Sequence, residues 1–129
     1  QKLKRDMREV ILSFKNSLQR LEEVLDEKPT DITRDAAIQR FEFTVELAWK
    51  STQKFLRERG LACNSPKGCL QEAFKFGLIE DDPLWLRMVD DRNLTVHTYD
   101  EEVAVAVFNR LGAYLPLLGK LLEAIEKGM

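Results

Sequence analysis

Hydrophobic residues recur every three or four positions along most of this chain, which is the period of an amphipathic α-helix. The pattern predicts a first long helix over residues 3–25, which ends before Pro29. A second helix opens within Asp31 to Asp35 and stops at Gly60, a residue type that commonly ends helices.

The second predicted helix carries more apolar residues than one hydrophobic seam can hold. Phe43, Leu47 and Trp49 lie outside the seam that its other apolar residues form. We therefore expect this helix to be buried on more than one side or to pair with a second subunit.

Three further helices follow. Ser65-Pro66 has the form of an N-cap followed by proline at the first helical position, and it starts a short helix that Gly77 interrupts. Asp82-Pro83 repeats this arrangement. Asp100 caps a final helix that extends to Ile125 and contains Pro116, and a kink or break is expected between Gly112 and Pro116.

These elements predict an all-α fold: an antiparallel up-and-down four-helix bundle with one short additional helix, in a single domain of residues 1–129. Hydrophobic residues at 44% and charged residues at 33% fit a globular protein. The formal net charge of -2 gives no overall attraction for nucleic acid, so any RNA contact would depend on a local patch. This charge argues against a sequence-indifferent RNA binder.

The N-terminal residues are charged and lack the apolar core of a signal peptide, and no apolar run approaches the roughly 18 residues of a membrane span. A cytoplasmic protein without membrane contact is expected.

Cys63 and Cys69 have no neighbouring histidine or further cysteine, so their spacing does not match a zinc site. They are expected to be two reduced thiols.

The segment from Arg92 to Tyr99 contains the single histidine of the chain, His97, together with an arginine and the amide of Asn93. Arg92 could bind a phosphate through two hydrogen bonds, Asn93 could orient it, and His97 could move a proton. The matching reaction is metal-independent RNA cleavage. On a continuous helix Arg92 and His97 point about 140° apart, so they converge only if the helix frays near Thr95 or a second subunit contributes its copy.

The same residues also fit a structural role. A lone histidine at a helix end is commonly a cap, and Arg92 could pair with Asp90, Asp91 or an acidic residue across the bundle. Tyr99 could lie at the edge of the core.

Two glutamates of the second helix lie one turn apart. Glu42 and Glu46 form a carboxylate pair, but the sequence identifies no further metal ligands, and no metal or cofactor is expected. Glu46 and Lys50 form an i,i+4 ion pair that is interpreted as a surface feature.

Two segments resemble the HEPN superfamily, and more closely its nucleotidyltransferase substrate-binding branch. Residues Arg40 to Lys50 are similar to the second helix of that branch, and Arg92 to Tyr99 match the superfamily pattern of arginine, four residues and histidine. The resemblance spans nearly the whole chain. It implies a small helical bundle, usually a homodimer, encoded beside a separate minimal nucleotidyltransferase.

The resemblance also implies roles for individual residues. In related HepT toxins the arginine and histidine support RNA cleavage, and a tyrosine two places after the histidine accepts adenylyl groups from the partner enzyme. Carried over, Arg92, Asn93 and His97 are candidate catalytic residues and Tyr99 is a candidate modification site.

We therefore expect a helical partner, or substrate-binding subunit, of a nucleotidyltransferase in a module similar to a toxin and antitoxin pair. The alternative is a ribonuclease that uses Arg92 and His97 and is controlled by adenylylation of Tyr99. The sequence holds no Gly-Ser followed by paired aspartates, so transferase chemistry must come from the separate partner.

Overall fold

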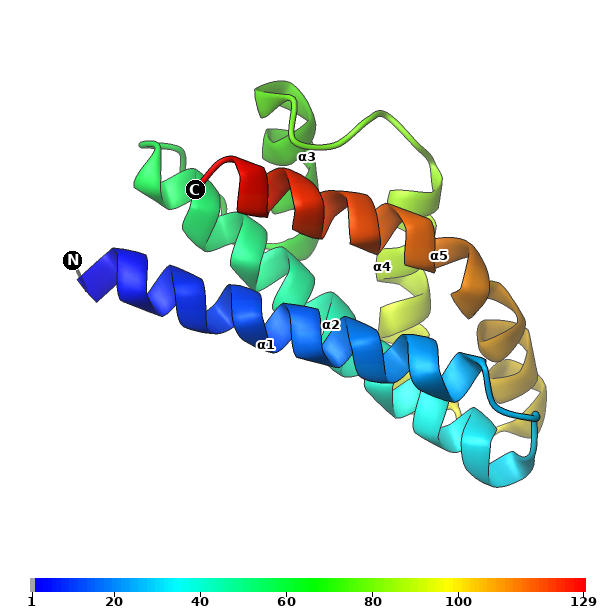
Figure 1. Ribbon diagram of the computed structural model, residues 1–129. Helices are drawn as coiled ribbons and strands as arrows, with labels where there is room; N and C mark the ends of the chain where they lie inside the picture. Colours follow the sequence, from blue (N-terminus) through cyan, green and yellow to red (C-terminus); the bar gives the residue numbers. More distant parts are fainter. Residues whose placement is uncertain (1) are drawn as a thin grey trace.

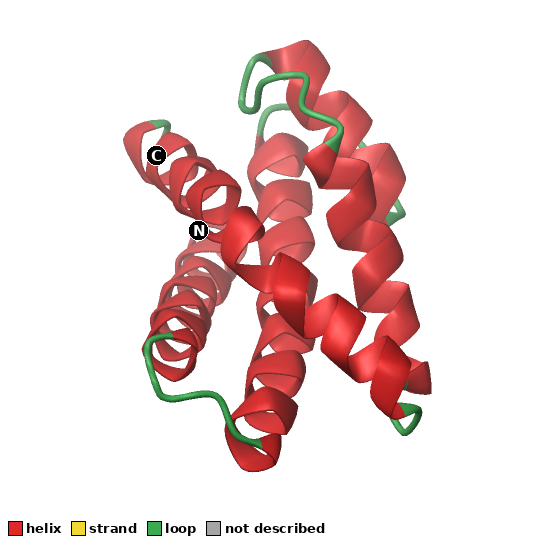
Figure 2. Ribbon diagram, turned by 90° about the vertical axis from the view of Figure 1, so that its right-hand side faces the viewer, coloured by secondary structure: helices red, strands yellow, loops and turns green. Residues whose placement is uncertain are grey.

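The computed structural model describes residues 2–129, and every regular element in this part of the chain is helical (Figures 1 and 2). The elements are α1 (Lys2–Leu25), α2 (Asp31–Glu58), α3 (Pro66–Phe76), α4 (Leu84–Leu94), the 3-10 helix η1 (Thr95–His97) and α5 (Glu101–Lys127). The predicted all-α class is confirmed, and the helices form a bundle. Three helices exceed twenty residues, whereas α3 and α4 have 11 residues each.

The helices begin and end where the local sequence favours it. The side chain of Ser65 accepts a hydrogen bond from the backbone N–H of Gly68 at 3.0 Å and so caps α3. Asp100 accepts from the N–H of Glu102 at 2.9 Å and caps α5. Gly60 follows α2 with a φ of 80°, a left-handed conformation that glycine adopts without the steric cost of a Cβ. These predicted boundaries are confirmed.

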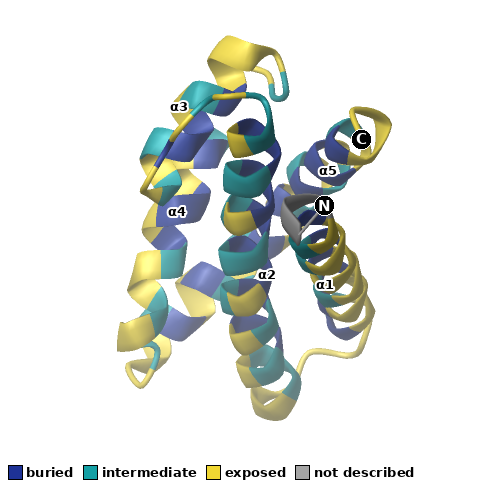
Figure 3. Ribbon diagram, turned by 90° about the vertical axis from the view of Figure 1, so that its left-hand side faces the viewer, coloured by how far each residue is buried: buried dark blue, intermediate teal, exposed yellow. Residues whose placement is uncertain are grey.

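One hydrophobic core joins all five α-helices. α1 and α2 run side by side in opposite directions, α5 packs against both, and α3 and α4 cover the remaining side of α2 (Figures 1 and 3). At its centre the rings of Phe41 and Tyr114 stack with centroids 5.7 Å apart. The largest fully buried side chains include Phe14, Phe41, Phe55, Leu111, Tyr114 and Leu118.

Helix α2 is buried on more than one side, as its apolar content predicted, because it contacts α1, α3, α4 and α5, and α3 and α4 lie on the side away from α1 (Figure 3). Leu47 and Trp49 are half-buried and pack against the core. Phe43 is the exception, with 51% of its surface exposed.

Helix α5 stays helical from Gly112 through Pro116, so the alternative of a break between these residues is wrong. Figure 1 shows the ribbon bending in the middle of the helix, which agrees with the expected kink.

Among the described residues α5 is also the one helix long and apolar enough to cross a membrane. That is weak support for a membrane span, because Leu111, Leu118 and Ile125 of this helix lie in the core.

The expectation of two reduced thiols is wrong: Cys63 and Cys69 form a disulfide. After Gly60 the chain turns back towards α2, where the carbonyl of Cys63 accepts a hydrogen bond from Gln53 at 2.7 Å. This turn brings Cys63 to the first turns of α3, with a Cα to Cα distance of 5.0 Å to Cys69. That distance lies within the range that a disulfide requires.

Candidate functional site

The segment from Arg92 to Tyr99 lies where α4 gives way to α5. The α-helix ends at Leu94 and the chain continues as the tighter η1. The hydroxyl of Thr95 donates to the carbonyl of Arg92 at 2.7 Å, and that of Thr98 donates to the carbonyl of Thr95 at 2.9 Å. Helical geometry therefore changes near Thr95, one of the two arrangements that the sequence left open.

Arg92 pairs with Glu46 of α2 across the bundle. Its Nη2 lies 3.3 Å from Oε1 of Glu46, and both side chains are half-buried. The other oxygen of Glu46 accepts from the indole N–H of Trp49 at 3.2 Å and lies 3.6 Å from Nζ of Lys50. Of the partners considered for Arg92, the structure selects an acidic residue across the bundle. Glu46 therefore links α2 to α4 through Arg92, in addition to its ion pair with Lys50 on its own helix.

A second contact joins the same two segments. Oγ1 of Thr95 lies 3.0 Å from Oε2 of Glu42, one turn before Glu46. Glu42 and Glu46 thus bind side chains of the Arg92 segment, and in the described part of the chain no third acidic, histidine or cysteine side chain completes a metal-binding group with them.

The other candidate residues face solvent. Asn93 and His97 are exposed, and Tyr99 has 87% of its surface exposed. The rings of His97 and Tyr99 meet edge to face with centroids 6.1 Å apart. No hydrogen bond joins the side chains of Arg92 and His97 in the described chain. The structure therefore places His97 beside Tyr99 and pairs Arg92 with Glu46.

A hollow of about 280 Å³ opens between α2 and η1 beside Tyr99. It is lined by Asp35, Ile38, Gln39, Glu42, Thr95, Thr98 and Tyr99. Two carboxylates, an amide and three hydroxyls line it, without a lysine or arginine. Such a lining favours cationic or neutral hydrogen-bonding groups over phosphate.

On its other side α4 is fixed to α5 by a buried carboxylate. Asp91, 1% exposed, accepts from Nε and Nη2 of Arg110 at 2.8 and 2.6 Å and from the hydroxyl of Tyr114 at 2.5 Å. Burial, together with the hydrogen bond to Asp91, raises the pKa of Tyr114, and the same carboxylate raises the pKa of Arg110. Sequence reasoning missed this network, although Arg110 and Tyr114 lie at i,i+4 on one helix face.

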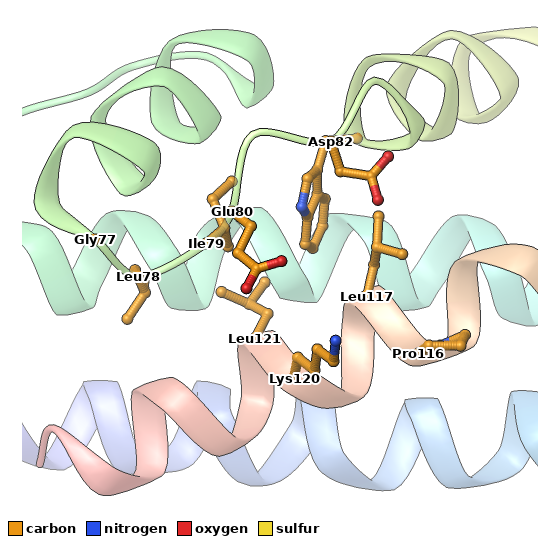
Figure 4. Close-up of a pocket in the computed structure, with 10 residues that line it drawn as sticks. Gly77, Leu78, Ile79, Glu80, Asp82, Pro116, Leu117, Lys120 and Leu121 are labelled. Carbon is orange, nitrogen blue, oxygen red and sulfur yellow. The ribbon is translucent and has the colours of Figure 1, made fainter.

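A separate hollow of about 280 Å³ lies between the loop after α3, the start of α4 and α5. Figure 4 shows the side chains of Glu80 and Lys120 entering the space between this loop and α5. None of the candidate residues from Arg92 to Tyr99 lines it, so it is distinct from the hollow beside Tyr99.

Comparison with known proteins assigns this helical bundle to a class. The chain belongs to the family described as nucleotidyltransferase substrate binding protein like, whose model matches residues 9–127. The resemblance stated from the sequence is thereby confirmed.

The chain is also similar to three individual proteins, two of them with solved structures. A protein of Haemophilus influenzae named probable ribonuclease HepT is 38% identical over 96 residues, which span 70% of this chain and 66% of that protein. A crystal structure of a protein from Thermus thermophilus is 46% identical, with a TM-score of 0.83, over 87% of this chain and 98% of that one. The structure of HI0074 from Haemophilus influenzae, described as revealing the fold of a substrate binding domain of a nucleotidyltransferase, is 30% identical, with a TM-score of 0.69, over 95% and 98%.

The buried network makes a prediction about stability. Replacing Tyr114 by phenylalanine removes its hydrogen bond to Asp91 and should lower the free energy of unfolding by about 1–3 kcal/mol at neutral pH. Folding raises the pKa of Tyr114 above its ordinary value of 10.0. The associated stabilisation is present below that pH and is lost as the pH rises further. Urea unfolding at neutral and alkaline pH measures both effects.

The matched control is Tyr99→Phe, which removes the only other phenol of the chain from an exposed position and should leave stability unchanged. Equal unfolding free energies for Tyr114→Phe and the wild type at neutral pH would contradict the prediction.

Proposed function

We propose that this chain is the helical partner, or substrate-binding subunit, of a separate minimal nucleotidyltransferase, in a module similar to a toxin and antitoxin pair. The observation that carries the proposal is the family match over residues 9–127, supported by the likeness to HI0074. The sequence holds no Gly-Ser followed by paired aspartates, so the partner supplies the transferase chemistry.

The geometry of the site supports a role in presenting a group to another protein. The hydroxyl-bearing ring of Tyr99 is 87% exposed, at the corner between η1 and α5. Arg92 is engaged by Glu46 within the subunit. A side chain in the position of Tyr99 can enter the active site of a second protein without rearrangement of the bundle.

In the proposed reaction the phenolic oxygen of Tyr99 attacks the α-phosphorus of ATP held by the partner. Diphosphate leaves, and the phenolic proton passes to a base of the partner. The product carries a new phosphodiester, and hence negative charge, beside the acidic hollow that contains Glu42.

A ribonuclease that uses Arg92, Asn93 and His97 is the second candidate function. It is favoured by the 38% identity to a protein named probable ribonuclease HepT and by the exposure of His97. Arg92 would have to leave Glu46 to bind a phosphate. Because the rings of His97 and Tyr99 are 6.1 Å apart, a nucleotide attached to Tyr99 would obstruct access of RNA to His97.

The partner experiment tests the first function. Incubation with the nucleotidyltransferase encoded beside this chain and with labelled ATP should label the wild type, whereas Tyr99→Phe should remain unlabelled because it lacks the accepting oxygen. Intact-mass spectrometry measures the addition. Tyr114→Phe is the matched control, since its hydroxyl is buried and should not be an acceptor. Label that persists in Tyr99→Phe would rule out Tyr99 as the acceptor.

The ribonuclease candidate makes a different prediction. If His97 transfers a proton, His97→Ala should reduce the rate of RNA cleavage by about a hundredfold or more. Tyr99→Phe should cleave as the wild type does. Cleavage of a labelled RNA, followed on a gel in the presence of a metal chelator, measures the rate. Undiminished cleavage by His97→Ala would show that the activity arises elsewhere.

We further propose that the subunit works as a cytoplasmic homodimer. Phe43 is half exposed and lines a hollow of about 460 Å³ between α1 and α2, and a second copy could cover such apolar surface. A stable interface would bury more than about 1,000 Å² in total. Light scattering should then give twice the chain mass of 15.0 kDa, and a mass of one chain at micromolar concentration would exclude the dimer.

A further inference from the structure

The guanidinium of Arg92 is the group of the candidate site best suited to bind phosphate, yet a carboxylate already occupies it. Nη2 of Arg92 and Oε1 of Glu46 are 3.3 Å apart, and their side chains are 26% and 31% exposed. Partial burial reduces screening by water and salt, so the charge of Glu46 acts strongly on anything that approaches Arg92.

Glu46 is itself held in place. Its second oxygen accepts a hydrogen bond from Trp49 at 3.2 Å and lies 3.6 Å from the ammonium of Lys50. An incoming phosphate would therefore have to displace from Arg92 a carboxylate that Trp49 and Lys50 also hold in position.

The surroundings add further negative charge. Glu42 lies one helical turn before Glu46, with its Oε2 3.0 Å from the hydroxyl oxygen of Thr95. Asp35 and Glu42 both line the hollow beside Tyr99. A phosphate at Arg92 would meet the carboxylate of Glu46 and lie about one helical turn from that of Glu42, and juxtaposed like charges disfavour binding strongly.

We propose that Glu46 is a specificity-determining residue that excludes phosphate groups, and hence RNA, from Arg92. Specificity of this kind comes from contacts that disfavour the wrong ligand rather than from contacts that favour the right one. The inference concerns the site within a single subunit, so it does not depend on a nucleotidyltransferase partner.

The test is the affinity of Glu46→Gln for a short single-stranded oligouridylate, measured by fluorescence anisotropy at low salt. Glutamine keeps an acceptor oxygen for Trp49 but removes the charge. Affinity should rise about tenfold or more, because Arg92 becomes available to a phosphate. The slope of log affinity against log salt should also steepen by about 0.7, the value for one added phosphate contact to a single strand.

Two controls separate this effect from a general change in charge. Glu23→Gln removes the same charge from an exposed position on α1, which does not contact α4, and should bind as the wild type does. The double variant Glu46→Gln with Arg92→Gln should lose the gain. The proposal is overturned if Glu46→Gln, with helical content unchanged by circular dichroism, binds no more tightly than the wild type, or if Glu23→Gln gains as much.

Discussion

The carboxylate of Asp91 is almost fully buried, and a charge in that position must receive hydrogen bonds from the protein. Arg110 and Tyr114 of α5 supply three of them. Loss of one partner of a buried charged network is far more costly than loss of a surface pair, because the remaining charge is left without compensation. These hydrogen bonds fix the position of α4 against α5. They therefore also determine where the residues that follow Asp91 along α4 lie.

Arg92 follows directly and points to the opposite neighbour, where it meets Glu46 of α2. The end of α4 is thus attached to α5 through Asp91 and to α2 through Arg92. Thr95 adds a second contact to α2 through Glu42. The exposed corner that carries His97 and Tyr99 follows these contacts along the chain. The contacts of α4 with α2 and α5 therefore fix the backbone that leads to these two accessible side chains.

The pairing of Arg92 with Glu46 also bears on how a short motif is interpreted. An arginine, four residues and a histidine provide the groups for phosphate chemistry, but their use depends on the charges that face them. Here a carboxylate of another helix faces the arginine, and the adjacent hollow is acidic. The same motif can therefore belong to a site that repels the ligand its residue types suggest.

The sequence alone determined that the chain is helical and where most of its helices begin and end. The exception is α4, which begins at Leu84, after the Pro83 that was expected at its first position. Hydrophobic spacing and caps such as Ser65 and Asp100 act within a few residues, so they can be recognised without knowledge of the fold. The resemblance of two segments was also sufficient to identify the family. The local change near Thr95 was one of the arrangements that the sequence allowed.

Only the tertiary structure decided which distant groups meet. The ion pair of Arg92 with Glu46 joins residues 46 positions apart, and the network of Asp91 depends on how α4 crosses α5. The disulfide of Cys63 and Cys69 was missed for a related reason, since it depends on the path of the loop after Gly60 and not on the spacing of the cysteines. Periodicity shows which face of a helix is apolar, but it does not show which neighbouring helix that face or its polar edge will contact.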